Sequence, residues 1–336
     1  MGRNDNNEVT TSPWSCCNCS LASRYTSDKM SQPVNQHWVP QFYLKYFATP
    51  ETQRTKNPKT WIFSKNEEDG DPKLTNIRNI CAKRFLYSPL NKDGQRVWKL
   101  ETRLSELETL FSVIWPTLAE GYADLLWEPL RKAVSLFASV LYLRHPNSLK
   151  QCIDAHDHLV KQYKQLPKKP DGTPNIAFVE VKGKIRKFDT SDWHEYKNWK
   201  EEEHHQFFCD SVQSHTGHLA KLLLRKRWSI IFTDAPAFIT SDNPVCKDHL
   251  EKEKFGFGTE GTIVTFPLSP TRLLIMDDNH KEPAGQYYPL RADGPGPFNL
   301  GIWRNSSRFM ISQRDVDEVL AEISEWADHQ ECQEKA

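Results

Sequence analysis

The sequence of 336 residues contains no long hydrophobic run, no secretory signal and no glycine-rich loop for binding phosphates. A helix needs about 20 consecutive apolar residues to cross a bilayer. The longest candidate, residues 133–143, is shorter than that and amphipathic. The first 30 residues also lack the short apolar stretch of a signal peptide. We therefore expect no membrane insertion and a cytoplasmic protein.

The chain also lacks net charge, because 44 Lys and Arg residues balance 44 Asp and Glu residues. Proteins that hold nucleic acid mainly by charge carry an excess of basic residues, so the charge balance does not support nucleic acid as the partner. A local basic groove remains open as an alternative, and the most basic stretches are residues 161–169 and 225–227. The sequence identifies no other partner.

The eight cysteines form no recognisable framework. Three lie together at positions 16, 17 and 19, but no second Cys or His pair follows nearby at the spacing of a zinc site. The other five are scattered along the chain. Free thiols of this kind are typical of a reduced, intracellular compartment.

Residues 1–33 are polar, rich in Asn and Ser, and without periodicity. Such a composition buries too little apolar surface to fold, so we predict a disordered tail there and a second one at residues 331–336. Residues 34–330 are predicted to form a single domain. Because Met30 directly precedes the first structured stretch, the sequence leaves open whether translation starts at Met1 or Met30.

Helical periodicity dominates the middle of the chain, and short apolar runs dominate its end. Helices are predicted at residues 100–114, 129–145, 154–163, 193–224 and 316–326. Strands are predicted at residues 61–63, 228–233, 237–240, 261–266, 273–276 and 309–311. Pro116 is expected to interrupt the first helix or to start the next segment. This order predicts an α+β fold, with a central helical bundle packed against a mostly antiparallel sheet built largely from the C-terminal third.

Residues 35–47 concentrate aromatic side chains around one histidine. Pro40 disfavours helix in the residue before it and suits the first turn of a following helix. The aromatic residues after Pro40 recur at helical spacing. We therefore expect His37 in a turn just before a short helix that docks on the rest of the domain.

Several motifs follow one another in a characteristic order. They are Gln36–Leu44 with Phe47, the helix of Glu101 and Glu108, Arg144–Pro146, Phe238–Val245, Pro267–Pro270, and Asn299 followed by Arg308. Across residues 35–320 this order resembles the family called domain of unknown function 4238 (DUF4238), which is common in bacteria. The resemblance implies a shared fold and no settled activity. At Ser64 the chain departs from the Asp that the resemblance implies.

Asp242 and Asn243 directly follow an apolar run, in the segment 240–245. Asp and Asn side chains often bond to their own backbone in such turns, which would make their role structural. The alternative is that both project from a strand end into a cleft and are catalytic. Because hard cations bind oxygen ligands, this alternative predicts a Mg or Mn site formed by Asp242 and Glu108.

His37 and Glu108 are the other predicted catalytic residues. A histidine changes charge near neutral pH, which suits a general base or a metal ligand, and a hydrogen-bonded packing role is the alternative. Glu101 and Glu108 lie seven residues apart, so they share one face of a helix. A solvated face is the alternative there. Glu108 neighbours the apolar stripe and is the better candidate for partial burial.

Arg144 and Asn299 are predicted to bind substrate. Arg144 ends an apolar helix, where its guanidinium either binds an anion or phosphate or interacts with the helix dipole. Asn299 stands between apolar residues. Once buried, it needs hydrogen-bond partners, and we expect Asp242 or Asn243 to supply them.

These polar residues come from distant parts of the chain, as the components of a composite active site do. The first hypothesis is a divalent-metal-dependent hydrolase, such as a nuclease, that acts on phosphodiester bonds in one cleft. The second is a non-catalytic binding or regulatory module in which the motifs are structural. A shared, accessible cleft favours the first hypothesis, and fully buried, mutually bonded polar groups favour the second.

Overall fold

The computed structural model describes residues 33–65, 71–175, 178–181, 184–187, 190–292 and 294–334. The chain divides after Val34, and its second unit begins at Asn35. Residues 1–32 of the predicted N-terminal tail lie outside the described residues. The predicted tail at the other end is partly helical, because the last helix continues to Glu334.

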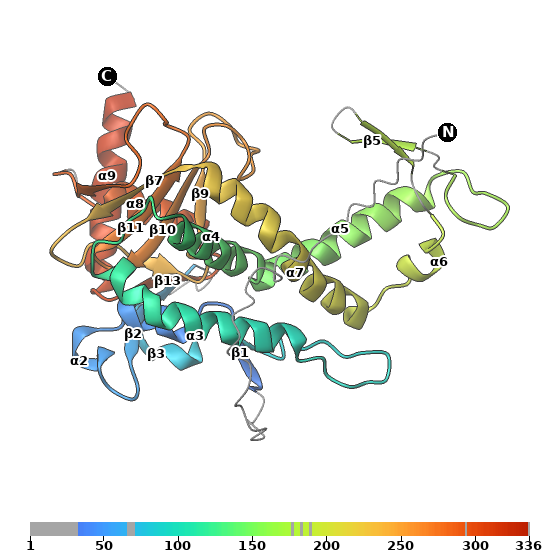
Figure 1. The fold of residues 1–336 in the computed structure, drawn as a ribbon, viewed down its shortest axis with the longest axis horizontal. Helices are drawn as coiled ribbons and strands as arrows, with labels where there is room; N and C mark the ends of the chain where they lie inside the picture. The colour runs from blue at the N-terminus through green and yellow to red at the C-terminus, as the bar shows by residue number, and fades with distance from the viewer. Residues whose placement is uncertain are drawn as a thin grey trace, which may run out of the picture. The chain divides into compact units, whose positions relative to one another are not determined.

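The longer helices occupy the middle and the end of the second unit (Figure 1). They are α3 (Lys99–Ala119), α4 (Glu128–Leu143), α5 (Pro146–Lys164), α7 (Glu201–Arg225), α8 (Gly296–Asn305) and α9 (Val316–Glu334). The short helices are α1 (Gln41–Leu44), α2 (Pro50–Gln53) and α6 (Trp193–Tyr196), with the 3-10 helices η1 (Lys45–Phe47) and η2 (Ile77–Asn79).

A five-stranded sheet comes entirely from the C-terminal third of the chain. Its order is β12 (Gln286–Pro289), β7 (Arg227–Phe232), β11 (Arg272–Asp277), β10 (Ile263–Ser269) and β9 (Cys246–Asp248). All pairs are antiparallel except β12 with β7. The apolar runs of β10 and β11 are buried along most of their length.

A four-stranded sheet joins the two ends of the domain. Its order is β3 (Lys73–Asn76), β2 (Lys59–Ser64), β13 (Phe309–Ser312) and β8 (Thr240–Ser241). Two antiparallel ribbons complete the described strands. They are β1 (Asn35–His37) with β4 (Ala82–Arg84), and β5 (Phe178–Val181) with β6 (Lys184–Lys187).

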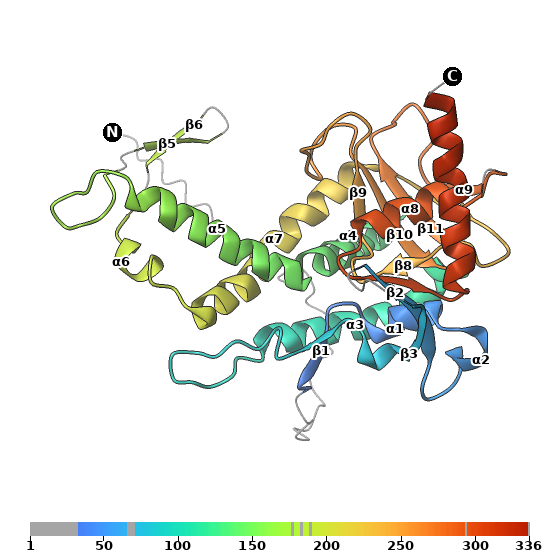
Figure 2. The ribbon, with the colours of Figure 1, turned by 180° about the vertical axis from the view of Figure 1, so that it is seen from behind.

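This architecture confirms the predicted α+β class and the largely antiparallel C-terminal sheet. The helices α3 and α4 pack beside the sheet strands, whereas α5 and the start of α7 extend away from them within the second unit (Figures 1 and 2). One direct tie between the two layers is the indole N–H of Trp115 on α3, which donates a hydrogen bond of 3.0 Å to the carbonyl of Leu268 on β10.

An aromatic core surrounds Tyr43, the central side chain of α1. Its ring lies 5.6 Å from that of Trp115 and 5.8 Å from that of Phe266, and it is fully buried. Its hydroxyl contacts Thr240 Oγ1 at 2.6 Å and donates to the carbonyl of Pro267 at 2.8 Å. The aromatic stretch therefore docks on the rest of the domain, as expected from its sequence.

Several local expectations are wrong. His37 is the last residue of β1 and pairs with Ala82, so it lies in a ribbon rather than in a turn. Pro116 does not interrupt α3, because the buried residues Trp115 and Leu118 on either side of it hold the last turn in place.

The predicted helix of residues 193–224 is two helices, α6 and α7. The carboxylate of Glu203 accepts the backbone N–H of Lys200 at 2.8 Å. This contact satisfies a donor at a helix start, so a new helix begins at Glu201 rather than continuing from α6.

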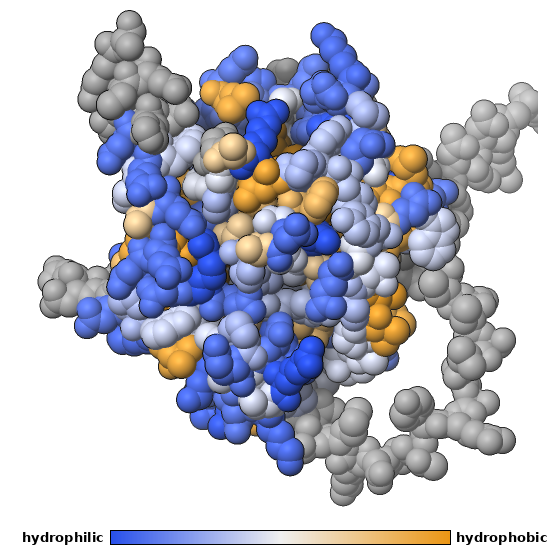
Figure 3. Space-filling model, turned by 90° about the vertical axis from the view of Figure 1, so that its left-hand side faces the viewer, coloured by the Kyte–Doolittle hydropathy of each residue, from blue (hydrophilic) through white to orange (hydrophobic). Residues whose placement is uncertain are grey.

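The face of the molecule on the side of α9 and α2 is mostly hydrophilic, with hydrophobic side chains in small separate groups (Figure 3). Within the described ranges, no helix combines the length and the apolar content needed to span a membrane. This finding agrees with the absence of a long hydrophobic run in the sequence.

Candidate functional site

A buried guanidinium lies at the C-terminal end of α4. Arg144 caps this helix and is 1% exposed. Its Nη1 donates to Glu108 Oε1 at 2.7 Å, and its Nε donates to the carbonyl of Trp38 at 2.8 Å. Its Nη2 is buried and has no partner in the described part of the chain. Arg144 therefore joins α3, α4 and the segment after β1 through charge-assisted bonds, and it retains one unused donor.

Glu101 lies two turns before Glu108 on α3. The pKa of Glu101 is raised to about 7, because burial and, to a smaller extent, the negative charge of Glu108 outweigh the opposing charge of Arg144. The two carboxyl groups therefore differ, because Glu108 is held in an ion pair while Glu101 retains its proton up to near neutral pH. Helical periodicity predicted that Glu101 and Glu108 share one face of the helix, but it did not predict the partial burial of Glu101.

His37 faces the same group of charges. Its Nε2 lies 3.2 Å from the carbonyl oxygen of Arg78. Because a carbonyl only accepts, Nε2 carries the proton and Nδ1 is the basic nitrogen of the neutral ring. Burial lowers the pKa of His37, against the opposing effects of the Arg78 hydrogen bond and the charge of Glu108. The ring is therefore neutral, and able to accept a proton, at neutral pH.

A second polar pair is fully buried beside this group. His145 Nδ1 accepts the backbone N–H of Asn147 at 3.0 Å, so its Nε2 carries the proton. That Nε2 lies 3.9 Å from Asp242 Oδ2 and has no hydrogen-bond partner among the described residues. Asp242 Oδ1 accepts the N–H of Ser307 at 2.9 Å. Sequence reasoning missed His145, although it stands within the Arg144–Pro146 motif.

Trp38 connects the two polar groups. Its indole N–H donates to the backbone carbonyl of Asp242 at 2.9 Å. Its ring meets the ring of His145 edge to face, with centroids 5.8 Å apart. Since its own carbonyl accepts from Arg144, Trp38 contacts both sides of the arrangement. The structure thus brings His37, Glu108, Arg144 and Asp242 into one connected neighbourhood.

The two predicted asparagines have contacts that hold backbone in place. Asn243 Nδ2 donates to the carbonyl of Asn305 at 3.2 Å, and its Oδ1 is buried without a partner among the described residues. Asn299 has no exposed surface, accepts the N–H of Ile239 and donates to the carbonyl of Ala237. The expectation that Asp242 or Asn243 bonds to Asn299 is therefore wrong.

Ser64, where the resemblance implies an Asp, lies across a strand from Asp242. It pairs with Phe309 of β13, and the N–H of Asp242 bonds to the carbonyl of the same Phe309. The Ser64 hydroxyl is buried and has no partner in the described ranges. This position therefore belongs to the neighbourhood of Asp242.

The described residues contain no group of three His, Cys, Asp or Glu side chains that could hold a metal ion. Glu108 already binds Arg144, and Asp242 accepts from Ser307 while it faces His145. Mg²⁺ and Mn²⁺ prefer several free oxygen ligands in near-octahedral geometry. The predicted pair of Asp242 and Glu108 does not supply them, because the contacts of both carboxylates are already with protein groups.

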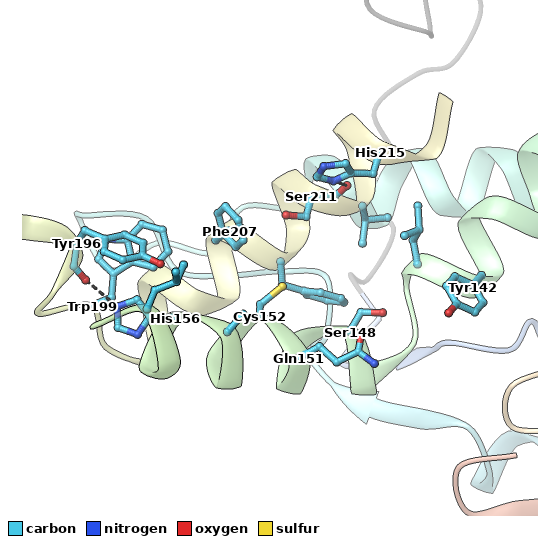
Figure 4. Close-up of a pocket in the computed structure, with 15 residues that line it drawn as sticks. Tyr142, Ser148, Gln151, Cys152, His156, Tyr196, Trp199, Phe207, Ser211 and His215 are labelled. Atoms are coloured by element: carbon cyan, nitrogen blue, oxygen red, sulfur yellow. Dashed lines mark hydrogen bonds between the residues drawn. The ribbon is translucent and has the colours of Figure 1, made fainter. Parts of the chain in front are cut away.

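Two cavities lie elsewhere in the second unit. A groove of about 370 Å³ runs between α5 and α7 (Figure 4), and a hollow of about 220 Å³ lies beside Tyr87. None of the predicted site residues lines either of them. The hydroxyl of Tyr87 nevertheless donates to the carbonyl of Arg144 at 2.9 Å, so the smaller hollow borders the polar neighbourhood.

A family model described as "Protein of unknown function (DUF4238)" matches residues 35–319. That range covers β1 through the start of α9 and includes every residue of the polar neighbourhood. No curated protein and no solved structure matches the chain.

Proposed function

We propose that this chain, which belongs to the DUF4238 family, is a hydrolase that cleaves a phosphodiester or similar bond in an anionic substrate by general acid–base catalysis. One observation supports it above the others. Glu101 and Glu108 share a face of α3, but the pKa of the partly buried Glu101 is raised to about 7, whereas Glu108 is ion-paired with Arg144. Enzymes divide acid and base roles between groups whose environments separate their pKa values.

Each role follows from the state of the group. Neutral His37 accepts a proton at Nδ1 from the attacking water, whose oxygen forms the new bond to phosphorus. The protonated carboxyl of Glu101 donates its proton to the leaving oxygen as the old bond to phosphorus breaks. Glu108, held by Arg144, positions these groups and stabilises the positive charge that develops on His37. General acids and bases each contribute about 10²–10⁴-fold to such reactions.

An anionic substrate is supported by the charge near His37. On the ribbon of β1 and β4, the exposed residues Lys83 and Arg84 pair with Gln36 and Asn35. These cations attract an anion toward the ribbon. The unused Nη2 of Arg144 is buried, so it would bind a substrate oxygen only where the substrate reaches this interior group. A guanidinium that already binds a carboxylate can bind a phosphate oxygen with a remaining N–H.

Backbone strain next to β4 agrees with a functional role for the ribbon. Cys81 and Phe85 flank this strand and adopt φ angles of 54°. Left-handed conformations are unfavourable for residues other than glycine and cluster at functional sites. The carbonyl of Cys81 accepts the N–H of Trp38 at 2.8 Å, so the strained residue holds the segment that carries His37.

Asp242 acts in this proposal as a positioning residue. It fixes Trp38 through its carbonyl and faces His145 with its carboxylate. Trp38 in turn directly follows His37 in the chain. The carboxylate acts on Trp38 only through His145, whose ring packs edge to face on that of Trp38. Loss of the carboxylate is therefore expected to reduce the rate by displacing His145, Trp38 and hence His37, without removing a reacting group.

The test is hydrolysis of bis(para-nitrophenyl) phosphate by the full chain and by the variants Glu101→Gln and His37→Asn. Each variant is expected to lose activity by about 100-fold or more. Glu106→Gln is the matched control, because Glu106 is an exposed carboxylate on the same helix. Wild-type activity in Glu101→Gln contradicts the proposed acid. A rate that requires added Mg²⁺ or Mn²⁺ and is abolished by chelation contradicts the metal-free roles.

The second candidate, a non-catalytic module, is favoured by a different observation. Asp242 and Arg144 are 1% exposed and Asn299 is fully buried, and the side chain of each is hydrogen-bonded to the backbone of another segment. In such a module the motifs only hold segments together. Two results together would favour this candidate over the hydrolase. The wild-type chain would not hydrolyse the phosphodiester, and Asp242→Asn would change only the melting temperature.

A further inference from the structure

The groove between α5 and α7 shares no residue with the polar neighbourhood described above. Ser148, Gln151, Cys152, Ala155 and Leu159 line it from α5. These positions are spaced by three and four residues, so they form one stripe that runs about 16 Å along the helix. The opposite wall is a matching stripe on α7 that includes Phe207, Ser211 and His215. The groove is therefore long and straight.

Apart from the imidazoles of His156 and His215, this groove is lined by uncharged side chains. None of its lining residues is Asp, Glu, Lys or Arg. The same helices are otherwise highly charged, with Glu201–Glu203 opening α7 and Lys150, Asp154 and Asp157 on α5. These charges lie between the lining positions in sequence, and hence on other faces of the helices. A site with this lining accepts an uncharged ligand and penalises a charged one.

One end of the groove is a preorganised aromatic wall. His156 stacks on Trp199 with an interplanar angle of 4° and meets Tyr196 edge to face. The ring of His156 is fixed, because its Nε2 lies 2.7 Å from the carbonyl of Tyr196. At mid-groove Phe207, which is 45% exposed, faces Cys152 across the gap (Figure 4). Aromatic walls of this kind favour ring-containing ligands.

The other end is polar. Ser148 and Gln151 lie there together (Figure 4). Within the described part of the chain, neither side chain has a hydrogen-bond partner in another protein group. A hydroxyl and an amide offer both donors and acceptors. This end is therefore able to orient a ligand that carries one polar group.

We propose that the groove binds a neutral, elongated molecule with an aromatic body and one hydrogen-bonding group at its end. The aromatic body lies against Phe207 and the wall formed by Trp199 and Tyr196, and the polar group meets Gln151 and Ser148. The volume of about 370 Å³ lies within the usual range of small-molecule sites. This site is independent of the hydrolytic site, and its occupant is a ligand rather than the proposed substrate, which is anionic.

The test is fluorescence titration of the full chain with N-phenyl-naphthylamine, an uncharged amine that joins a phenyl ring to a naphthalene. The expected result is saturable binding of one molecule per chain at micromolar concentration. Anilinonaphthalene sulfonate, a related molecule with a negative charge, is expected to bind at least about tenfold more weakly at pH 8, because no Lys or Arg lines the groove to pair with its sulfonate. Equal binding of the two probes overturns the inference that the groove selects a neutral ligand.

Two variants assign the binding to the groove. Cys152→Trp fills the centre of the groove, and Gln151→Glu places a charge inside it. Each variant is expected to weaken binding of the neutral probe at least about tenfold, as the loss of a contact in a pocket does. Lys150→Glu is the control, since it alters charge on the same helix outside the lining, and it is expected to bind as wild type does. Circular dichroism verifies that each variant is folded.

Unchanged binding in both groove variants overturns the proposal, since the probe then binds elsewhere. Sedimentation supplies a further criterion. If the wild-type chain is a dimer and Cys152→Trp is a monomer, the groove binds a second copy of the chain. That result also overturns the proposal of a small-molecule ligand.

Discussion

The indole N–H of Trp38 donates a hydrogen bond of 2.9 Å to the backbone carbonyl of Asp242, across 204 residues of sequence. This bond joins the aromatic segment near the start of the domain to the turn that follows β8. On the other side of Trp38, its carbonyl accepts from the buried guanidinium of Arg144. One tryptophan thus links the two polar groups from which the candidate site is built.

Replacing Trp38 by Phe tests this link. The variant keeps an aromatic ring near His145 but leaves the carbonyl of Asp242 without its donor. We expect a loss of about 1 kcal/mol in the free energy of unfolding, the usual net value of one such bond. Urea denaturation measures it. Trp127→Phe is the control, since Trp127 is 58% exposed, and an equal loss in both variants contradicts a specific role for the bond.

Replacing Arg144 by Met tests the buried ion pair. The change leaves Glu108 and the carbonyl of Trp38 without their donor, and removal of one partner of a buried pair typically costs about 3–5 kcal/mol. We expect a loss in this range by urea denaturation. The double variant Arg144→Met with Glu108→Gln is expected to recover part of the loss, because no uncompensated charge remains. Additive losses contradict a direct coupling of the two residues.

Glu101 predicts how stability depends on pH. Its folded pKa of about 7 lies above the ordinary value of 4.5, so the folded state binds more protons than the unfolded state between these two pH values. Stability contributed by the neutral carboxyl is therefore present at low pH and is lost as pH rises toward 7.

The variant Glu101→Gln removes this ionisation. We expect it to be more stable than wild type by about 1–2 kcal/mol near pH 8, after allowance for solvent screening at a partly exposed carboxyl, and equally stable near pH 4. Thermal or urea unfolding at both pH values measures the difference. An equal gain in the free energy of unfolding at pH 4 and pH 8 means that ionisation of the Glu101 carboxyl does not cause the gain. If the same variant is inactive, stability and catalysis oppose each other at this residue.

Asp242 separates the effect of charge from the effect of hydrogen bonding. Asp242→Asn retains an oxygen that accepts the N–H of Ser307 but loses the charge that faces His145. Asp242→Ala loses both. We expect Asp242→Ala to lower the free energy of unfolding by about 1–3 kcal/mol more than Asp242→Asn, because it leaves a buried donor unsatisfied. Equal losses indicate that the charge, not the bond to Ser307, accounts for the stability.

Elements with a strong local period agree closely between sequence and structure. The helix predicted at 129–145 is α4, residues Glu128–Leu143, and the strand predicted at 273–276 is β11, residues Arg272–Asp277. These signals are readable because the side-chain periods of helices and strands are properties of a few consecutive residues. The fold class follows from their order.

Local signals failed where a distant contact controls the backbone. Pairing with Ala82 makes His37 part of a strand, and core packing of Trp115 carries α3 past Pro116. Asn299 turns to the backbone of Ala237 and Ile239 rather than to Asp242. No periodicity encodes these partners, because each is set by which segments meet in space.

By itself, the sequence determined the family resemblance, the α+β class, the main helices and strands, and which polar residues interrupt apolar segments. Only the tertiary structure decided that Glu108 binds Arg144, that His145 faces Asp242, and that Glu101 is buried enough for its pKa to reach about 7. The physical reason is that periodicity depends on neighbours along the chain, whereas burial, ion pairing and desolvation depend on neighbours in space.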